Sequence, residues 1–162
     1  MTTPWARRGL ATPSLCYIAR MRTLCAFLVV MVLPLAAEKK AIVPPEFAGG
    51  TANFSPGVLV DGTLYVSGQI GQDLKTKQVP GDFEAEVKTV LGNIGIVLKA
   101  AGMDYKDVVS VQVYLTDMDL FQRMNAVYVT FFPDPRPSRT TVGVTKLAAA
   151  AARIEVTVTA RK

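Results

Sequence analysis

Residues 137–162 read PSRTTVGVTKLAAAAARIEVTVTARK and contain two stretches with the alternation of a β-strand. In the second stretch, apolar side chains alternate with Glu155 and two threonines between Ile154 and Ala160. In the first, Arg139 stands where the strand begins. A charge moved into a dry interior is strongly destabilising, so we expect both charged residues to be solvated, paired or held for a ligand.

The preceding segments predict three more strands and two helices. Asp61-Gly62 separates two β-rich runs, which predicts a hairpin because a type I′ turn needs positive φ at both central residues. Apolar residues recur every three or four positions over residues 82–101, which predicts a helix on which Gly92 and Gly95 allow close packing on the sheet. A strand over 109–115 follows, and then a helix that begins at Asp117 or Asp119 and runs to Phe132.

The predicted order is ββαβαββ, an α+β fold with a mixed sheet. Right-handed crossovers place both helices on one face of the sheet. The other face is then uncovered and both polar and aromatic, so we expect it to pack against copies of itself in a ring, with small polar residues and water at the centre. The residues predicted for the uncovered face are Tyr65, Ser67, Ser110, Gln112, Tyr114, Thr141, Gly143, Glu155, Thr157 and Thr159.

A hairpin of the last two strands would bring Arg139 beside the chain near Ala160. Arg139 would then lie about five residues, or roughly 16 Å, from Glu155 at the usual rise of a strand. At that separation, both side chains could contact one small molecule only if Arg139 came from one subunit and Glu155 from another.

Composition excludes several kinds of chemistry. From Glu38 onward the chain has 14 basic and 13 acidic residues, so a phosphate-backbone partner is not indicated. The whole chain has no His, and both cysteines lie before residue 38. The body therefore has no thiol nucleophile, imidazole base or Cys/His metal site, and its chemistry has to use carboxylates, hydroxyls, Arg, Lys, backbone groups and water.

Residues 1–37 form an N-terminal extension. Its segment 21–37, MRTLCAFLVVMVLPLAA, has one Arg, a short apolar run and two alanines before charged residues, the layout of a secretory signal peptide. We expect cleavage near Ala37, export to the periplasm or medium, and no stable membrane anchor afterwards. A mitochondrial presequence and an uncleaved anchor are the alternatives, and a native N-terminus at Met1 or Met21 would contradict export. Residues 38–53 contain Pro-Pro and Gly-Gly and are interpreted as an extended arm or linker.

From Phe54 to Lys162 the chain resembles the Rid (YjgF-type) enamine/imine deaminases. The motifs that carry the resemblance are FSPGVLVDGTLYVSGQIG, LKAAGMDYKDVV, YLTDMDLFQRMNAVYVTFF and PRPSRTTVGV followed by IEV. The resemblance implies a chorismate-mutase-like domain that forms a homotrimer with three clefts between subunits. It also implies a hydrolase that converts 2-imino or 2-enamino acids to 2-keto acids and ammonia without a cofactor or metal.

The resemblance also assigns site residues. The Arg that binds the substrate carboxylate corresponds to Arg139, and the acid that handles the attacking water corresponds to Glu155. The other cleft positions fall on Phe54, Ser67, Gly68, Asn125 and Thr141. Many members have Cys at the position of Thr141, and deaminating members have Tyr at that of Phe54. The loop LAAAAAR lacks the usual Pro and is one residue longer.

The proposed chemistry is possible with these residue types. An Arg fork binds a carboxylate bidentately, and a protonated imine needs only a placed water and a carboxylate to take its proton. The alternative is a non-catalytic trimer that binds a small carboxylate or acts as a partner or holdase module, which Phe54 and export would suit. A ribonuclease activity ranks third, because the body is nearly neutral and has no His.

Overall fold

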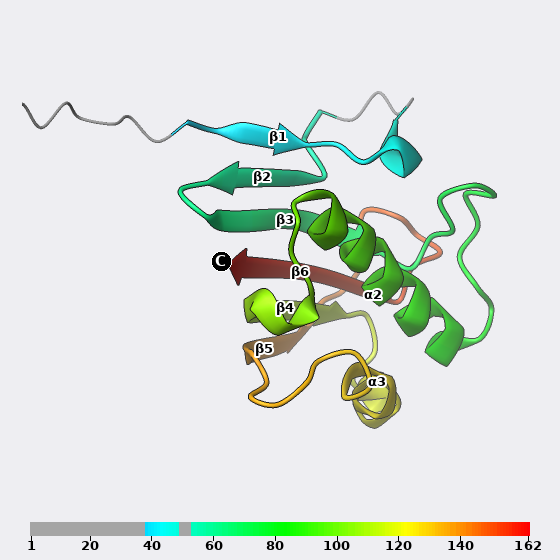
Figure 1. Ribbon diagram of the computed structural model, residues 1–162. Coiled ribbons are helices and arrows are strands. Elements are labelled where there is room, and N and C mark those ends of the chain that lie inside the picture. The colour runs from blue at the N-terminus through cyan, green and yellow to red at the C-terminus, as the bar shows by residue number, and fades with distance from the viewer. Residues whose placement is uncertain (1–37, 49–52) are drawn as a thin grey trace, which may run out of the picture. The chain divides into compact units, whose positions relative to one another are not determined.

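The computed structural model describes residues 38–48 and 53–162. This part of the chain is built on a mixed sheet of six strands (Figure 1). The strands are β1 (Lys40–Ile42), β2 (Gly57–Val60), β3 (Thr63–Ile70), β4 (Val108–Leu115), β5 (Ser138–Gly143) and β6 (Ile154–Arg161). The helices are α2 (Phe83–Ala100) and α3 (Phe121–Tyr128), with short 3-10 turns at Pro45–Phe47, Tyr105–Asp107 and Met118–Leu120. The spatial order is β1-β2-β3-β6-β4-β5, and the only parallel pair among these strands is β4 with β5.

The predicted α+β fold is confirmed, with both helices packed on one face of the sheet (Figure 1). The turn between β2 and β3 has positive φ at Asp61 (47°) and Gly62 (71°), as a type I′ hairpin requires. Helix α2 begins after Asp82, whose carboxylate accepts a hydrogen bond from the Ala85 amide at 2.8 Å. Apolar side chains of α2 and α3 cover the buried residues of β3, β6 and β4 to form one core.

Two local predictions were wrong, and one segment has more structure than expected. The segment interpreted as an extended arm contains the short strand β1, which pairs with the edge of β2 and buries Ile42. Helix α3 ends at Tyr128 instead of Phe132. Gly92 and Gly95 do not allow α2 to approach the sheet, because Gly92 faces open space and Gly95 makes room for the hydroxyl of Tyr105.

The last two strands do not form the predicted hairpin. Strand β6 lies between β3 and β4 and is antiparallel to both, while β5 pairs with the far edge of β4. Residues 144–153 carry the chain from β5 past β4. The central position suits β6 because its alternating apolar residues are buried, and both of its edges find hydrogen-bond partners there.

This topology changes the predicted uncovered face. Thr141 and Gly143 are paired with Val113 and Leu115, whose side chains are buried toward the helices, so they lie on the helix side of the sheet. Thr140 and Val142 take their place on the uncovered face, because an edge strand need not bury its apolar residues. The other predicted members of the uncovered face on β4 and β6 are confirmed by register: Ser110 opposite Thr159, Gln112 opposite Thr157, and Tyr114 opposite Glu155.

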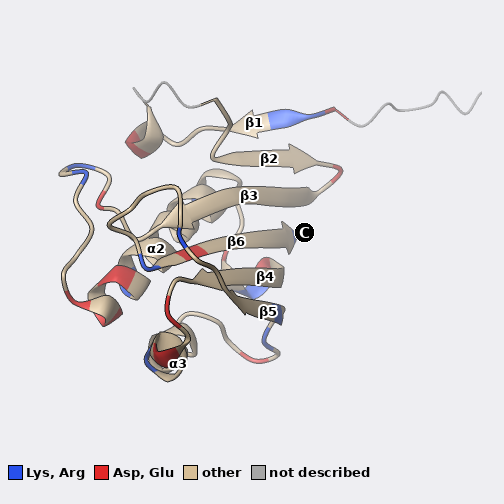
Figure 2. Ribbon diagram, turned by 180° about the vertical axis from the view of Figure 1, so that it is seen from behind, with Lys and Arg blue, Asp and Glu red and all other residues tan. Residues whose placement is uncertain are grey.

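The uncovered face carries little charge. On strands β3, β6, β4 and β5, its charged side chains are Glu155 and Arg161, at opposite ends of β6. Figure 2 views the molecule from behind relative to Figure 1, with this face toward the viewer and the four strands drawn mostly in the colour of uncharged residues. Tyr65 (54%) and Val142 (41%) are exposed on it.

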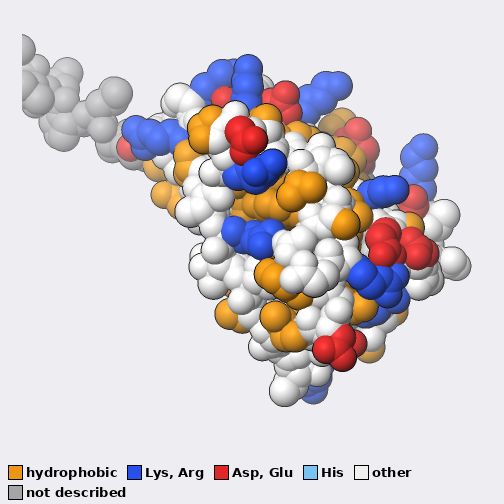
Figure 3. All heavy atoms as spheres, turned by 90° about the horizontal axis from the view of Figure 1, so that it is seen from below, with side chains coloured by type: hydrophobic (Ala, Val, Ile, Leu, Met, Phe, Trp, Pro, Cys, Tyr) orange, Lys and Arg blue, Asp and Glu red, His pale blue; other side chains and the backbone are white. Residues whose placement is uncertain are grey.

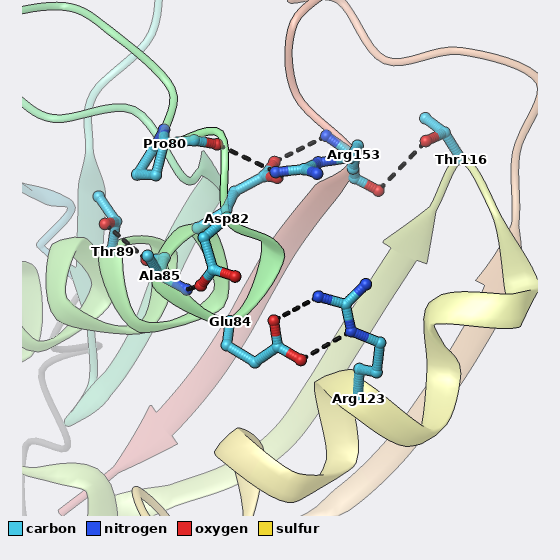
Figure 4. A network of polar contacts seen from close by, with 9 residues as sticks. Pro80, Asp82, Glu84, Ala85, Thr89, Thr116, Arg123 and Arg153 are labelled. Atoms are coloured by element: carbon cyan, nitrogen blue, oxygen red, sulfur yellow. Dashed lines mark hydrogen bonds and ion pairs between the residues drawn. The ribbon is translucent and has the colours of Figure 1, made fainter.

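An ion pair between a fully buried carboxylate and a partly exposed guanidinium anchors the start of β6. The carboxylate of Glu86, a fully buried residue of α2, accepts hydrogen bonds from the Arg153 amide at 2.7 Å and from its Nε at 2.6 Å. Arg153 also donates to the Pro80 carbonyl, and its own carbonyl accepts from the Thr116 hydroxyl at 3.4 Å (Figure 4) and from the Thr116 amide at 3.0 Å. The residues just before Glu155 are therefore attached to α2, to the loop before it and to the end of β4.

The predicted signal peptide, residues 21–37, lies outside the described residues, as do residues 49–52 of the predicted arm. Within residues 38–48 and 53–162, neither helix has the length and apolar character needed to cross a bilayer.

The buried pair yields a stability prediction. We expect Glu86→Ala to lower the free energy of unfolding by about 3 kcal/mol, because it leaves Arg153 without its buried partner. Glu84→Ala on the same helix is the control, since Glu84 binds Arg123 at the surface and its loss is expected to change little. Urea denaturation of both variants measures the difference, and equal effects would contradict the anchoring role of Glu86.

Candidate functional site

Glu155 lies on the uncovered face, at a break in the β3–β6 ladder. It is opposite Ile70 on β3 and Tyr114 on β4, and the register of β3 shifts between Val66 and Gln69. The shift leaves Ser67 and Gly68 as a bulge beside the Glu155 side chain. A Cβ on Gly68 would stand 2.0 Å from the Oε1 atom of Glu155, so only glycine leaves room for this carboxylate.

Ser67 attaches the segment of Phe54 to the same bulge. Its hydroxyl donates to the Ser55 carbonyl at 2.7 Å, and its amide donates to the Pro56 carbonyl at 3.0 Å. Phe54 is 63% exposed and lines a cavity of about 440 Å³ together with Gly68. The structure therefore brings together four of the predicted site residues: Phe54, Ser67, Gly68 and Glu155.

Arg139 lies on the other side of the sheet, near α3. It is opposite the buried Val111 on β4, and its guanidinium carbon is 4.5 Å from the centroid of the Tyr128 ring and 5.6 Å from that of Phe121. These distances are those of cation–π contacts. Arg139 takes part in no ion pair or side-chain hydrogen bond among the described residues, so its N–H groups are available to an anion.

Asn125 and Thr141 accompany Arg139. Asn125 lines a cavity of about 330 Å³ with Tyr128, Arg136 and Arg139. Thr141 is two residues from Arg139 on the same face of β5. Figure 3 views the molecule from the end where α3 and β5 lie and shows basic side chains among hydrophobic ones. These three predicted residues, Asn125, Arg139 and Thr141, form a second group.

Two buried hydroxyls near Arg139 have no hydrogen-bond partner among the described residues. They belong to Thr141 and Tyr128, and no other buried side-chain polar atom in the described chain lacks a partner. Burial raises the pKa of the Tyr128 hydroxyl, while the guanidiniums of Arg139 and Arg136 act in the opposite direction. Buried polar groups are nearly always paired in native structures, so two unpaired ones beside an unpaired guanidinium indicate a place for a ligand.

Sequence reasoning did not assign Tyr128 to the site. The signal was the Asn125–Tyr128 spacing of three, which puts a polar side chain and a phenol on one face of a helix. Arg136 was missed as well.

The two groups lie on opposite faces of the sheet. Glu155 is on the uncovered face with Tyr114, whereas Arg139 is on the helix face with Val111. The distance expected from a terminal hairpin does not apply, because that hairpin is not present. No described contact joins the two groups within one chain, and no cluster of three acidic side chains or other metal-ligating groups occurs in residues 38–48 and 53–162.

The chain is similar to proteins of one family along most of the described region. The family model described as Endoribonuclease L-PSP matches residues 47–162. A 2-iminobutanoate/2-iminopropanoate deaminase of Rattus norvegicus is 41% identical over 110 residues, which are 67% of this chain and 80% of the relative. A RutC family protein of Saccharolobus solfataricus is 46% identical over 110 residues, 67% of this chain and 86% of the relative.

Solved structures agree with this similarity. The YjgF gene product of E. coli is 29% identical with a TM-score of 0.71, over 76% of this chain and 98% of that one. RidA from the Antarctic bacterium Psychrobacter sp. is 31% identical with a TM-score of 0.71, over 76% of this chain and all of the other.

Gly68 yields a prediction about the placement of the carboxylate. In Gly68→Ala the new methyl group meets Glu155, so we expect the carboxylate to move and the melting temperature to fall. Gly92→Ala is the matched control, because its methyl group enters open space and alanine favours the helix by roughly 1 kcal/mol. Thermal unfolding and a crystal structure of each variant measure both effects. A Gly68→Ala structure with an unmoved Glu155 would contradict the role assigned to Gly68.

Proposed function

This chain belongs to the Rid (YjgF-type) family, and on that premise we propose that it hydrolyses 2-imino and 2-enamino acids to 2-keto acids and ammonia. The relative from Rattus norvegicus bears the name of this activity at 41% identity. The observation that carries the proposal is the unpaired Arg139 guanidinium on its aromatic support, beside two hydroxyls without partners.

Arg139 is proposed to bind the substrate carboxylate. A guanidinium presents parallel N–H donors that match the two oxygens of a carboxylate. Contact with the faces of two aromatic rings leaves the edge of the guanidinium available for this interaction. Asn125 lines the same cavity as Arg139, and Thr141 is two residues further along the same face of β5, so both are candidates to assist at this end of the substrate.

Glu155 is proposed to handle the water. A protonated imine is electrophilic at C2, so a water oxygen attacks C2 while the Glu155 carboxylate takes one of its protons. The resulting carbinolamine recovers this proton on its nitrogen. Its C–N bond then breaks to release ammonia, while the freed Glu155 carboxylate takes the hydroxyl proton and the carbonyl of the keto acid forms. That proton passes to ammonia, so the net products are the keto acid and ammonium. No electron carrier or metal enters the balance of this reaction.

We propose that the site forms between subunits of a homotrimer. Arg139 and Glu155 lie on opposite faces of one sheet, so the Arg139 group of one chain has to meet the Glu155 group of another for both to contact one small molecule. The weakly charged uncovered face, with Tyr65 and Val142 exposed, suits burial against other copies.

Phe54 is the feature that favours the alternative, a trimer that binds a small carboxylate or a partner without catalysis. Phe54 lines the 440 Å³ cavity beside Gly68 but offers no hydroxyl there, so a water near it has to be held by backbone groups or by the other polar side chains that line the cavity, such as Ser55 and Gln69. A ribonuclease activity, which the description of the family names, has less support, because the chain from Glu38 onward is almost neutral and has no His.

The turnover prediction uses imines generated in the assay. An amino-acid oxidase supplies 2-iminopropanoate or 2-iminobutanoate, and semicarbazide trapping reports how much imine remains. We expect the protein to accelerate imine loss, Arg139→Ala to abolish the acceleration, and Glu155→Gln to lower it at least about 100-fold, as is usual for a lost general base. Lys146→Ala, a change in the loop after β5, is the control and is expected to act like the wild type.

Equal rates with wild type, Arg139→Ala and buffer would make the enzyme proposal wrong. If the wild type then still bound 2-oxobutanoate and Arg139→Ala did not, the non-catalytic alternative would stand.

A mixing experiment tests the position of the site. When inactive Arg139→Ala and Glu155→Gln chains are unfolded together and refolded at equal amounts, one cleft in each mixed trimer combines an intact Arg139 with an intact Glu155. These are about a quarter of all clefts, because about a quarter of the trimers contain only one kind of chain. We therefore expect activity to return to roughly a quarter of the wild-type value. Light scattering checks that each preparation is trimeric. A mixture as inactive as its components would place the site within one chain and contradict the inter-subunit proposal.

A further inference from the structure

Tyr128 lies in the last turn of α3, directly under the Arg139 guanidinium. The residue is 4% exposed, and its ring centroid is 4.5 Å from the Arg139 guanidinium carbon. Its ring also stacks against Phe132 at 4.5 Å, which fixes its position in the core. The ring therefore forms a rigid support for the guanidinium.

The hydroxyl of Tyr128 lacks a hydrogen-bond partner among the described residues, unlike the hydroxyls of Tyr105 and Tyr114. Tyr105 donates to the Leu91 carbonyl at 2.8 Å, and Tyr114 donates to the Gln112 side chain at 3.1 Å. The Tyr128 hydroxyl is buried and has no partner among the described residues. A buried donor without an acceptor destabilises a fold, so this hydroxyl is expected to have an acceptor that is not part of the chain, such as a ligand.

The charged groups near this hydroxyl are donors. Arg139 and Arg136 both lie close enough to act on the phenol electrostatically, and both line the 330 Å³ cavity with Tyr128. A guanidinium has no acceptor atom. Arg136 is paired with the Asp134 carboxylate at 2.9 Å, whereas Arg139 has no ion-pair partner among the described residues. Two donor groups, the Arg139 guanidinium and the Tyr128 hydroxyl, thus lie together without an acceptor.

We propose that Tyr128 is a further ligand-binding residue of this site: its ring holds the Arg139 guanidinium, and its hydroxyl donates to the same ligand carboxylate. This inference rests on the proposed function, which puts a 2-imino or 2-keto acid carboxylate on Arg139. No hydrogen bond or ion pair with described residues holds the guanidinium in its place over the Tyr128 ring, so a bound carboxylate can shift it and reach both groups. Burial, which raises the pKa of Tyr128, keeps the hydroxyl protonated as a donor.

The test separates the hydroxyl from the ring with two variants. Tyr128→Phe keeps the ring and removes the hydroxyl, and Tyr128→Leu removes both. We expect Tyr128→Phe to weaken 2-oxobutanoate binding about 10-fold or more, the effect of one hydrogen bond to a charged group, and Tyr128→Leu to weaken it further. Because the carboxylate contact persists through the reaction, KM should rise while kcat changes little. Isothermal titration calorimetry and steady-state rates measure both effects.

Tyr105→Phe is the matched control. It removes a hydroxyl that has a partner, so we expect a lower melting temperature with unchanged affinity. Tyr128→Phe removes a hydroxyl without a partner, so we expect an equal or higher melting temperature with lower affinity. A purely structural role for Tyr128 would not produce this opposite pattern.

Three outcomes overturn the inference. If the wild type binds 2-oxobutanoate and Tyr128→Phe binds it equally well, the inference is wrong and the proposed function stands. If Tyr128→Phe loses affinity only in proportion to a lower melting temperature, the residue is structural. If the wild type neither binds the keto acid nor consumes the imine, the proposed function and this inference are both wrong.

Discussion

The two-sided pairing of β6 is the constraint on which the rest of the structure depends. Because β6 forms antiparallel ladders with both β3 and β4, its register is determined from both sides. A slip by one residue would turn Glu155 into the core and expose Ile154 and Val156, which are buried. The Glu86–Arg153 pair reinforces this register from α2, at the residue that precedes the strand. The pairing of β6 on both sides gives the Glu155 carboxylate a defined position, as the role proposed for it requires.

The same topology separates the two charged groups of the candidate site. Strand β5 is parallel to β4 at the sheet edge, so Arg139 takes the orientation of Val111 and faces the helices. Glu155 takes the orientation of Tyr114 and faces away from them. A single copy therefore presents half of a site on each side of the sheet. The homotrimer proposed above offers a way to combine the halves, and it would also cover the weakly charged face of the sheet.

The two charged groups of the candidate site, Glu155 and Arg139, are accommodated in the fold in different ways. Glu155 occupies the space left by a residue without a side chain, Gly68, at a bulge. Arg139 lies on the faces of Tyr128 and Phe121, which stabilise a cation without neutralising it. Neither charge has an opposite charge beside it in the described chain. This is the state expected of groups kept for a charged or polar ligand, and it differs from Glu86 and Arg153, which neutralise each other.

The sequence by itself determined the order of the elements from β2 onward, the Asp61-Gly62 hairpin, both helices and the alternation that puts Glu155 opposite the core face, because these follow from local backbone preferences and the period of apolar residues. The resemblance named residues of both halves of the site. Only the tertiary structure decided that β6 enters the sheet between β3 and β4, that Arg139 and Thr141 face the helices, and that Tyr128 lies under Arg139. The physical reason is that strand order, and the choice of which face of an edge strand meets the helices, depend on hydrogen bonds and contacts between residues far apart in the chain. The local sequence pattern of β5 does not distinguish its two faces.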